Sequence, residues 1–282
     1  MTRYLITGAR GMLGTDLLEA LAGRDVTALG RDDLDITEPS AVLDAVAGHD
    51  VVLNAAAYTD VDQAESDEER ARAVNAIGAG NLAAAAARHG ARMVQFSTDY
   101  VFDGTATEPY PEDAPRHPLG AYGRTKAEGE ERVLAALPDG AMIVRTAWLY
   151  GRNGGNFART MLRLAAERDT VQVVTDQIGQ PTWSADLARQ TVRLLDAAAP
   201  AGIYHGTNAG RTSWHGFAQA IFEVAGLDPA RVEPTDSAQF TRPAPRPAYS
   251  VLGHSGWVKA GIPPMRAWPD ALHEAFATGA LT

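Results

Sequence analysis

Three glycines near the N-terminus constrain the fold more than any other feature of this chain. Gly8, Gly11 and Gly14 are spaced G-x-x-G-x-x-G, directly after the apolar segment Tyr4–Thr7 and at the start of the helical segment Leu13–Ala22. Glycines in such a turn permit a tight reversal, let the backbone approach a phosphate, and let the helix pack closely on the strand. The free N–H groups at the start of the helix attract phosphates. The turn therefore predicts the first βαβ unit of a nucleotide-binding sheet.

The first half of the chain continues this alternation of strand and helix. The remaining strand-length apolar runs are Val26–Leu29, Val51–Asn54, Met93–Ser97 and Met142–Arg145, and the helical segments between them are Ser40–Ala47, Glu68–His89 and Tyr122–Ala136. Near-continuous apolar strands separated by helices indicate a parallel sheet that is buried on both faces. We therefore expect an α/β fold with a Rossmann-type doubly wound parallel sheet in a dinucleotide-binding domain over residues 1–150.

After Gly151 the pattern becomes mixed. Helices are expected at Phe157–Glu167, Ser184–Asp196 and Ser213–Ala225, with a strand at Val171–Thr175. No low-complexity linker separates the two halves of the sequence. We therefore expect a smaller mixed α/β C-terminal substrate domain, formed mainly by residues 151–282, with later segments returning to the sheet.

Charge and residue usage exclude several classes of protein. The chain has 282 residues and a net charge of -10, which argues against nucleic acid or an anionic membrane surface as a partner. It has no cysteine, which excludes disulfides and thiolate catalysis, and its first residues do not resemble a signal peptide. No apolar run approaches the roughly 18 residues of a membrane helix. We expect a cytoplasmic protein without a membrane or nucleic-acid partner.

Residues after the second and third strands would contact the rest of a dinucleotide. Arg31 follows the second strand, with Asp32 and Asp33 directly after it. An arginine there neutralises a 2′-phosphate, whereas an acid binds a ribose 2′-hydroxyl. Because Arg31 comes first, NADPH is favoured as the cofactor and NADH remains open. The predicted cofactor-binding residues are Gly8, Arg10, Gly11, Met12, Leu13, Arg31, Asp35, Ile36, Ala55, Ala56, Ala57, Tyr58, Tyr122 and Lys126.

Tyr122 and Lys126 lie four residues apart at the start of a predicted helix, so their side chains share one face. A carbonyl that accepts a hydride also needs a proton, and the usual tyrosine pKa of about 10 makes the phenol a slow donor at neutral pH. We expect the nearby ammonium and the positively charged nicotinamide to stabilise the phenolate and so lower the pKa of the phenol. Together with the glycine-rich turn, the pair predicts nicotinamide-dependent carbonyl reduction.

A hydroxyl group at the end of the fourth strand is expected to hold the substrate carbonyl. This strand ends in Ser97 and Thr98. Side chains alternate along a strand, so only one of the two hydroxyls can face the ligand. We predict that Thr98 is the third catalytic residue, with Ser97 as the alternative.

Longer strings in both halves resemble the dTDP-4-dehydrorhamnose reductases, a family within the extended short-chain dehydrogenases/reductases. The strings are GARGMLG at 8–14, NAAAYTDVDQAE at 54–65, STDYVFDG at 97–104, YGRTK at 122–126, RTAWLYG at 145–151, NFARTM at 156–161, DQIGQPT at 176–182 and RPAYS at 246–250. The resemblance therefore spans almost the whole chain.

This resemblance implies NAD(P)H-dependent reduction of the C4 ketone of dTDP-6-deoxy-L-lyxo-4-hexulose to dTDP-L-rhamnose, by a monomer or homodimer. It implies that Thr98, Tyr122 and Lys126 are catalytic. The implied substrate-binding residues are Thr98, Asp99, Trp148, Asn156 and Arg246. A guanidinium suits a diphosphate because it can donate two parallel hydrogen bonds.

Three alternative functions remain open, and the sequence differs from some members of the family at one position. The chain could be another nucleotide-sugar 4-ketoreductase, an epimerase that keeps its NAD bound, or a non-catalytic nucleotide-binding regulatory subunit. Some relatives carry a glutamate after the glycine-rich turn that contributes to a magnesium-bound dimer. Asp16 occupies that place here, and the shorter carboxylate leads us to predict no metal site.

Overall fold

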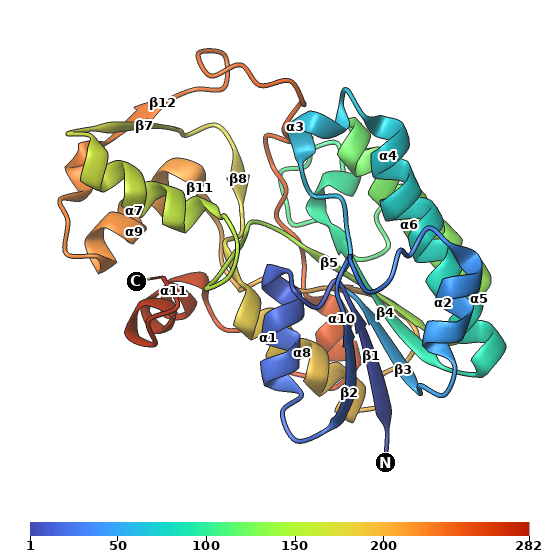
Figure 1. Ribbon diagram of the computed structural model, residues 1–282. Helices are drawn as coiled ribbons and strands as arrows, with labels where there is room; N and C mark the ends of the chain where they lie inside the picture. Colours follow the sequence, from blue (N-terminus) through green and yellow to red (C-terminus); the bar gives the residue numbers. More distant parts are fainter. Residues whose placement is uncertain (282) are drawn as a thin grey trace.

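The computed structural model describes residues 1–281, which form a large and a small lobe (Figure 1). A six-stranded sheet with the order β10-β5-β4-β3-β1-β2 organises the large lobe, and every neighbouring pair is parallel. Its strands are β1 (Arg3–Thr7), β2 (Asp25–Leu29), β3 (Val51–Asn54), β4 (Arg92–Thr98), β5 (Ala141–Thr146) and β10 (Gly202–His205). The predicted doubly wound parallel sheet is confirmed. Its strand order reverses between β1 and β3, where sheets of this kind bind ligands.

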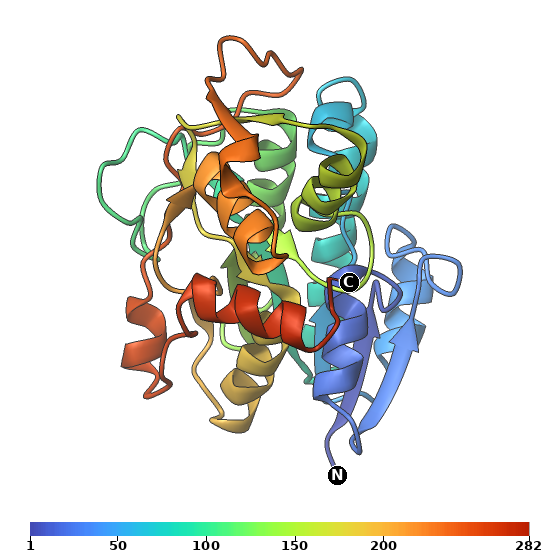
Figure 2. The ribbon, with the colours of Figure 1, turned by 90° about the vertical axis from the view of Figure 1, so that its left-hand side faces the viewer.

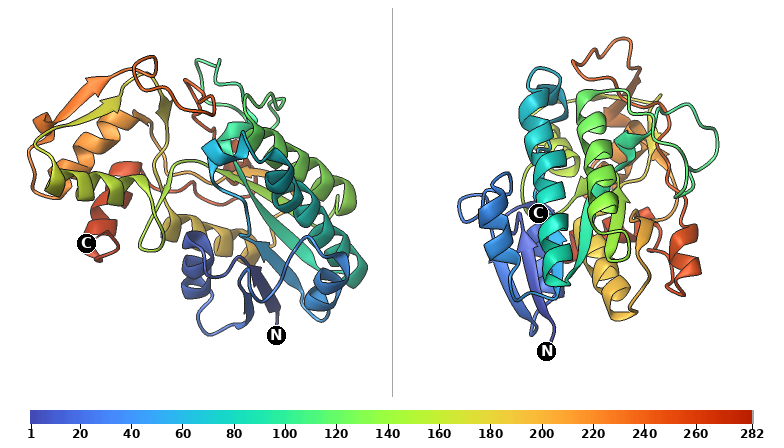
Figure 3. Two further views of the ribbon diagram at one scale, coloured as in Figure 1. Left: turned by 45° about the horizontal axis from the view of Figure 1, so that its top comes forward. Right: turned by 90° about the vertical axis from the view of Figure 1, so that its right-hand side faces the viewer.

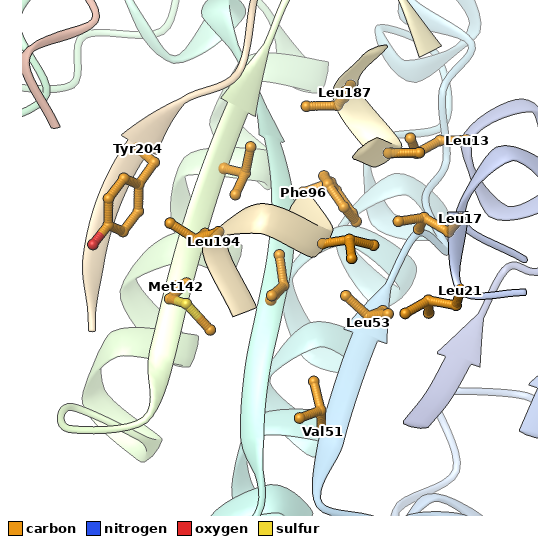
Figure 4. Packing of buried hydrophobic residues seen from close by; sticks show 14 of the residues in the cluster. Leu13, Leu17, Leu21, Val51, Leu53, Phe96, Met142, Leu187, Leu194 and Tyr204 are labelled. Carbon is orange, nitrogen blue, oxygen red and sulfur yellow. The ribbon is translucent and has the colours of Figure 1, made fainter. Parts of the chain in front are cut away.

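Helices cover both faces of the sheet because apolar side chains alternate along each strand. Ile6, Leu53 and Phe96 pack against α1 (Met12–Ala20) and α8 (Ser184–Asp196), as Figure 4 shows for part of this cluster. The intervening side chains, such as Leu5, Val52 and Met93, point to the other face. The helices there are α2 (Pro39–Val46), α5 (Ala79–His89) and α6 (Ala121–Ala136). Figure 3 shows α5 and α6 side by side on that face.

The predicted helix 68–89 is not regular throughout. It consists of α4 (Glu68–Arg72), a π-helical turn over Ala73–Gly78, and α5. The wide turn carries buried Asn75, whose side chain accepts from the Tyr58 backbone N–H at 2.9 Å and donates to the Tyr58 carbonyl at 3.1 Å. π-Turns of this kind are frequent at functional sites. Here the turn fastens the segment that follows β3.

The small lobe has its own core, which includes Tyr150, Phe217 and Phe222. Its helices are α7 (Phe157–Glu167), α9 (Trp214–Val224) and α11 (Trp268–Ala277), which Figure 2 shows in front of the sheet. Its short strands pair as β6 (Leu149–Tyr150) with β9 (Thr182–Trp183), β7 (Val171–Val174) with β12 (Val232–Thr235), and β8 (Ile178–Gly179) with β11 (Thr212–Ser213).

Segments late in the sequence return to the large lobe. α8, β10 and α10 (Ser255–Lys259) contribute Leu187, Tyr204 and Trp257 to the core under the sheet. The short elements that remain are α3 (Val61–Ala64), a 3-10 turn at Asp99–Val101 and another at Pro229–Arg231. A division of the chain into domains at residue 150 stays a prediction. Within residues 1–281, no helix is long and apolar enough to span a membrane.

Candidate active site

A cavity of about 900 Å³ lies at the carboxyl ends of β1 to β5. Every residue predicted from the sequence to bind the cofactor lines it. They are Gly8, Arg10, Gly11, Met12, Leu13, Arg31, Asp35, Ile36, Ala55, Ala56, Ala57, Tyr58, Tyr122 and Lys126. The fold thus brings the glycine-rich turn and the Tyr122–Lys126 pair to one cavity, at the edge where parallel sheets bind nucleotides.

The glycine-rich turn fits the phosphates of a dinucleotide. Gly8 has a φ of 69° in the left-handed region, and a Cβ there would lie 2.5 Å from the backbone nitrogen of Ala56. A Cβ on Gly14 would lie 2.3 Å from the Gly8 carbonyl oxygen, so only glycine lets α1 start so close to β1. Because α1 begins at Met12, its unpaired N–H groups and positive dipole end lie beside the cavity.

The charged residues after β2 are arranged around Arg10. Its guanidinium lies 3.1 Å from an Asp32 carboxylate oxygen and 2.9 Å from an Asp33 carboxylate oxygen. Asp33 also accepts from the Gly30 backbone N–H at 2.8 Å. Arg31 is exposed, lines the cavity and makes no ion pair within residues 1–281. Arg10 thus pairs with both acids and offsets about half of their charge, whereas Arg31 makes no such pair and is the cation available to a phosphate.

Lys126 is held in place by the strand beneath it. Its Nζ donates to the Phe96 carbonyl oxygen of β4 at 2.6 Å, and the side chain is buried. Burial lowers the pKa of the Lys126 ammonium to about 8, although the nearby Glu130 carboxylate acts in the opposite direction. Lys126 is therefore protonated in most molecules at neutral pH, although its pKa lies only slightly above that pH.

Tyr122 differs from the expectation drawn from the sequence. Burial raises the pKa of its phenol to about 12; a hydrogen bond with Thr98 lowers that pKa and the charge of Asp99 raises it. The prediction that Lys126 lowers this pKa is wrong for the protein alone, because the ammonium is directed to the Phe96 carbonyl. The phenol therefore retains its proton at neutral pH, as a proton donor must.

The two hydroxyls at the end of β4 have different partners. Ser97 Oγ donates to the Glu130 carboxylate at 2.6 Å. Thr98 Oγ1 donates to Asp99 Oδ1 at 3.1 Å and accepts from the Tyr100 N–H at 3.2 Å, and the Thr98 side chain acts to lower the pKa of the nearby Tyr122 phenol. This arrangement favours Thr98 over Ser97 as the hydroxyl beside a substrate carbonyl.

Glu130 was not predicted from the sequence, and it is fully buried. It lies one turn after Lys126 on α6 and accepts hydrogen bonds from Arg145 Nε at 2.8 Å and Nη2 at 2.7 Å. Arg116 adds a third guanidinium contact at 3.2 Å. Burial acts to raise the pKa of Glu130, but these arginines hold it below its usual value. The four-residue spacing from Lys126 was the available signal.

Asp99 is buried with one carboxylate oxygen, Oδ2, lacking a hydrogen-bond partner within residues 1–281. Burial raises the pKa of its carboxyl to about 6, against the effect of hydrogen bonds from Ser250 and Thr98. A buried, under-bonded carboxyl next to a candidate proton donor is typical of functional sites.

None of the five predicted substrate-binding residues is among the residues that line the cavity, and their roles stay predictions; they are Thr98, Asp99, Trp148, Asn156 and Arg246. Trp148 has a φ of 47°, rare for a residue with a side chain, and stacks on Trp214 with ring centroids 3.6 Å apart. Asn156 caps α7, because its Oδ1 accepts from the Arg159 N–H at 3.1 Å. Arg246 pairs with Asp62 at 2.5 Å.

Several cavity residues were missed by sequence reasoning. Thr59, Arg70 and Thr146 line the cavity, as do Gly154 and Gly155 from the small lobe. Thr146 ends β5, and its buried hydroxyl has no hydrogen-bond partner within residues 1–281. Its position at a strand end beside the Rossmann turn was a usable signal, whereas the loop glycines follow no local pattern.

Comparisons with known proteins agree with this geometry. A dTDP-4-dehydrorhamnose reductase of Streptomyces griseus is 54% identical over 282 residues, covering 97% of this chain and 93% of that protein. A Streptomyces antibioticus protein described as a probable dTDP-4,6-dihydroxy-2-methyloxan-3-one 4-ketoreductase is 52% identical, covering 97% and 94%. The crystal structure of a dTDP-4-dehydrorhamnose reductase from Bacillus anthracis in complex with NADP matches with a TM-score of 0.95 at 40% identity, covering 99% of this chain and 100% of that one.

The family model described as the RmlD substrate binding domain matches residues 2–280. That match covers both the sheet with its glycine-rich turn and the small lobe. The chain belongs to the RmlD substrate-binding-domain family.

Proposed function

We propose that this protein uses NADPH to reduce the C4 ketone of dTDP-6-deoxy-L-lyxo-4-hexulose, also called dTDP-4-dehydro-6-deoxy-L-mannose, to dTDP-L-rhamnose. The observation that carries the proposal is that Tyr122 and Lys126 line the same cavity as the glycine-rich turn, with Thr98 near Tyr122 at the end of β4. The names of relatives at 54% identity and 40% identity support the substrate.

The cavity residues would hold the cofactor along its length. Backbone N–H groups at the start of α1 would bind the diphosphate, and Arg31 would bind the 2′-phosphate that distinguishes NADPH. The Lys126 ammonium would donate to ribose hydroxyls. A reduced nicotinamide bound in this cavity supplies the hydride to the ketone carbon. The NADP in the Bacillus anthracis structure supports this choice of cofactor.

Tyr122 would supply the proton. Its phenol is protonated at neutral pH, so it can hydrogen-bond to the C4 carbonyl oxygen and transfer the proton as that oxygen becomes an alkoxide. Thr98 would donate a second hydrogen bond to the same oxygen, and the Lys126 charge would stabilise the phenolate that remains. The phenolate then takes a proton from solvent, which restores the site.

The nucleotide sugar would lie between the cavity and the small lobe. Asp99 would bind a sugar hydroxyl, Trp148 and Asn156 would bound the pocket, and Arg246 would bind the diphosphate. The division of labour between a cofactor domain over 1–150 and a substrate domain mainly over 151–282 belongs to this proposal. A cytoplasmic location and a monomeric or homodimeric state stay predictions.

A second candidate is reduction of a related 4-ketosugar, because the relative at 52% identity is described as a 4-ketoreductase for a different dTDP-sugar. An epimerase would return its cofactor to the starting state in each turnover and consume no NADPH. A regulatory subunit would bind nucleotide without turnover, and the presence of Thr98, Tyr122 and Lys126 counts against it.

A substrate panel separates these candidates. Purified protein would be given NADPH with the dTDP-4-keto-6-deoxy sugars of L-lyxo and D-xylo configuration, and kcat/KM would be measured for each. We expect the L-lyxo sugar to be preferred, with dTDP-L-rhamnose identified by NMR. Preference for the D-xylo sugar would establish the second candidate, and no NADPH consumption with either would refute the reductase proposal.

A further inference from the structure

We propose that Asp62 is a positioning residue for the diphosphate of the nucleotide sugar. Asp62 holds Arg246, and the segment that carries it, against the start of the helix that bears Tyr122. The inference rests on the proposed function, because it takes Arg246 as the diphosphate ligand, and it adds a residue that no sequence pattern singled out.

Residues 236–250, here called the strap, cross from the small lobe to the large lobe and back (Figure 1). At its start, Ser237 donates to the Asp176 carboxylate at 2.9 Å. At its end, the Ser250 N–H donates to the Ile178 carbonyl oxygen at 2.9 Å. Both ends are thus tied to the small lobe near β8, and the middle of the strap lies on α3 of the large lobe.

Asp62 of α3 makes the attachment at the middle of the strap. Its Oδ2 accepts from Arg242 at 2.6 Å, and its Oδ1 accepts from Arg246 at 2.5 Å and from the Ala244 N–H at 3.1 Å. Three donors from five consecutive strap residues converge on one carboxylate. The Arg246 hydrogen bond, more than any other contact, holds the pKa of Asp62 well below its usual value. The carboxylate is therefore ionised throughout the physiological range.

The charges at this contact do not cancel. Two guanidinium groups share one carboxylate, which leaves about one net positive charge on the strap by simple count. The Arg246 side chain is only 17% exposed and that of Arg242 is 49% exposed, so the inner cation is the better oriented of the two. A fixed, partly desolvated guanidinium is suited to a diphosphate.

The same contact reaches the catalytic helix. Burial acts to lower the pKa of the Arg246 guanidinium, but Asp62, helped by the nearby Tyr100, raises it. The Tyr100 ring in turn meets the Tyr122 ring edge-on with centroids 5.7 Å apart. α3 also holds the helix itself, because Glu65 accepts from the Ala121 N–H at 2.7 Å. A Cβ on neighbouring Gly120 would lie 2.5 Å from Glu65 Oε1 and 3.3 Å from Cδ of Pro245 in the strap, so both segments lie close to the start of the helix. α3 and the residue that follows it therefore contact both the strap and the start of α6, and they fix the position of one relative to the other.

Binding measurements on Asp62→Asn test the inference, with dTDP as the probe of the diphosphate site and NADPH as the probe of the cofactor site. The asparagine keeps the shape but loses the charge that binds two guanidinium groups. We expect the Kd for dTDP to rise about tenfold, the size of effect seen when a charge-assisted contact is lost. The Kd for NADPH should change by less than about twofold, and the rise in KM for the sugar should exceed the fall in kcat.

Two further variants separate positioning from general stability. Glu68→Gln removes a nearby but more exposed ion pair, with Arg124 at 2.7 Å, that does not touch the strap, and it should leave dTDP binding unchanged. Asp62→Glu keeps the charge and should recover most of the affinity. Unchanged dTDP binding in Asp62→Asn, or equal weakening of dTDP and NADPH, would overturn the inference. A wild-type protein that binds dTDP in an Asp62-dependent way but reduces no 4-ketosugar would refute the proposed function and leave the inference standing.

Discussion

Ser97 donates a 2.6 Å hydrogen bond to the buried carboxylate of Glu130, and this contact decides which hydroxyl at the end of β4 is free to act. Ser97 is directed to Glu130 in the middle of α6, whereas the hydroxyl of the next residue, Thr98, lies near Tyr122 at the start of the same helix. The same carboxylate lies one helical turn from Lys126 and is the charge that opposes the lowering of the Lys126 pKa. Glu130, which is outside the cavity lining, thus binds the Ser97 hydroxyl and influences the pKa of Lys126.

Replacing Tyr122 by phenylalanine removes the proposed proton donor and little else. We expect kcat to fall roughly a hundredfold or more, the usual contribution of a general acid. Cofactor affinity should stay nearly unchanged, because the ring that lines the cavity remains. Steady-state kinetics with NADPH titration by fluorescence measure both quantities. Retained turnover would mean that the proton comes from another group.

Replacing Glu130 by glutamine tests the buried charge cluster. The change leaves Arg145 and Arg116 without their shared anion, and breaking a buried pair in this way costs about 3–5 kcal/mol of unfolding free energy. Glu131→Gln is the matched control, because the neighbouring Glu131 pairs with Arg116 on the surface and such pairs contribute about 0–1 kcal/mol. Denaturant unfolding of the two variants measures the difference. Equal losses would contradict the role given to the buried carboxylate.

Asp99 should make stability depend on pH. Its folded-state pKa of about 6 lies above the ordinary 3.8, because burial disfavours the charged form. Its contribution is therefore fully present below the ordinary pKa and is lost as pH rises through 6, so ionised Asp99 destabilises the fold at neutral pH. Two pKa units correspond to roughly 3 kcal/mol as an upper value.

Asp99→Asn removes this ionisation. We expect the variant to gain stability relative to the wild type at about pH 7.5 and to lose most of that gain at about pH 4. Denaturant unfolding at the two pH values measures the change. A difference between variant and wild type that does not vary with pH would show that Asp99 is not a strained ionised group.

Arg31 should determine the preference between the two cofactors. Arg10 is paired with Asp32 and Asp33, so Arg31→Ala removes the cation that is available to the 2′-phosphate. The KM for NADPH should therefore rise about tenfold or more, while the KM for NADH stays nearly constant. Asp32→Asn is the control and should leave the preference nearly unchanged, since Asp33 still pairs with Arg10. Equal effects of Arg31→Ala on both cofactors would place the 2′-phosphate elsewhere.

Short sequence patterns predicted those elements of the molecule that depend on only a few consecutive residues. The glycine-rich turn, the five early strands and the Tyr122–Lys126 spacing each occupy a few consecutive residues, and the cavity collects all of them. The wide turn at Asn75 was not predicted, because a π-turn differs from an α-turn by one residue and has no distinctive composition.

Polar contacts between residues that are far apart in the sequence were also not predicted. Asp62 and Arg246 are 184 residues apart, and no local sequence pattern indicates that they contact each other. For a related reason, the pKa of the Tyr122 phenol in the protein alone lies above its usual value and not below it. The four-residue spacing brings the two side chains to one face of the helix. However, burial has the largest effect on the pKa of Tyr122, and the Lys126 ammonium is directed to the Phe96 carbonyl.

Transfer of deuterium from NADPH labelled at its transferable position tests the central claim most directly. The protein would be incubated with this cofactor and dTDP-6-deoxy-L-lyxo-4-hexulose, and the product would be examined by NMR and mass spectrometry. We predict dTDP-L-rhamnose with one deuterium at C4, formed in equal amount to the NADPH consumed. A product without deuterium at C4, or NADPH bound but not consumed, would contradict the account.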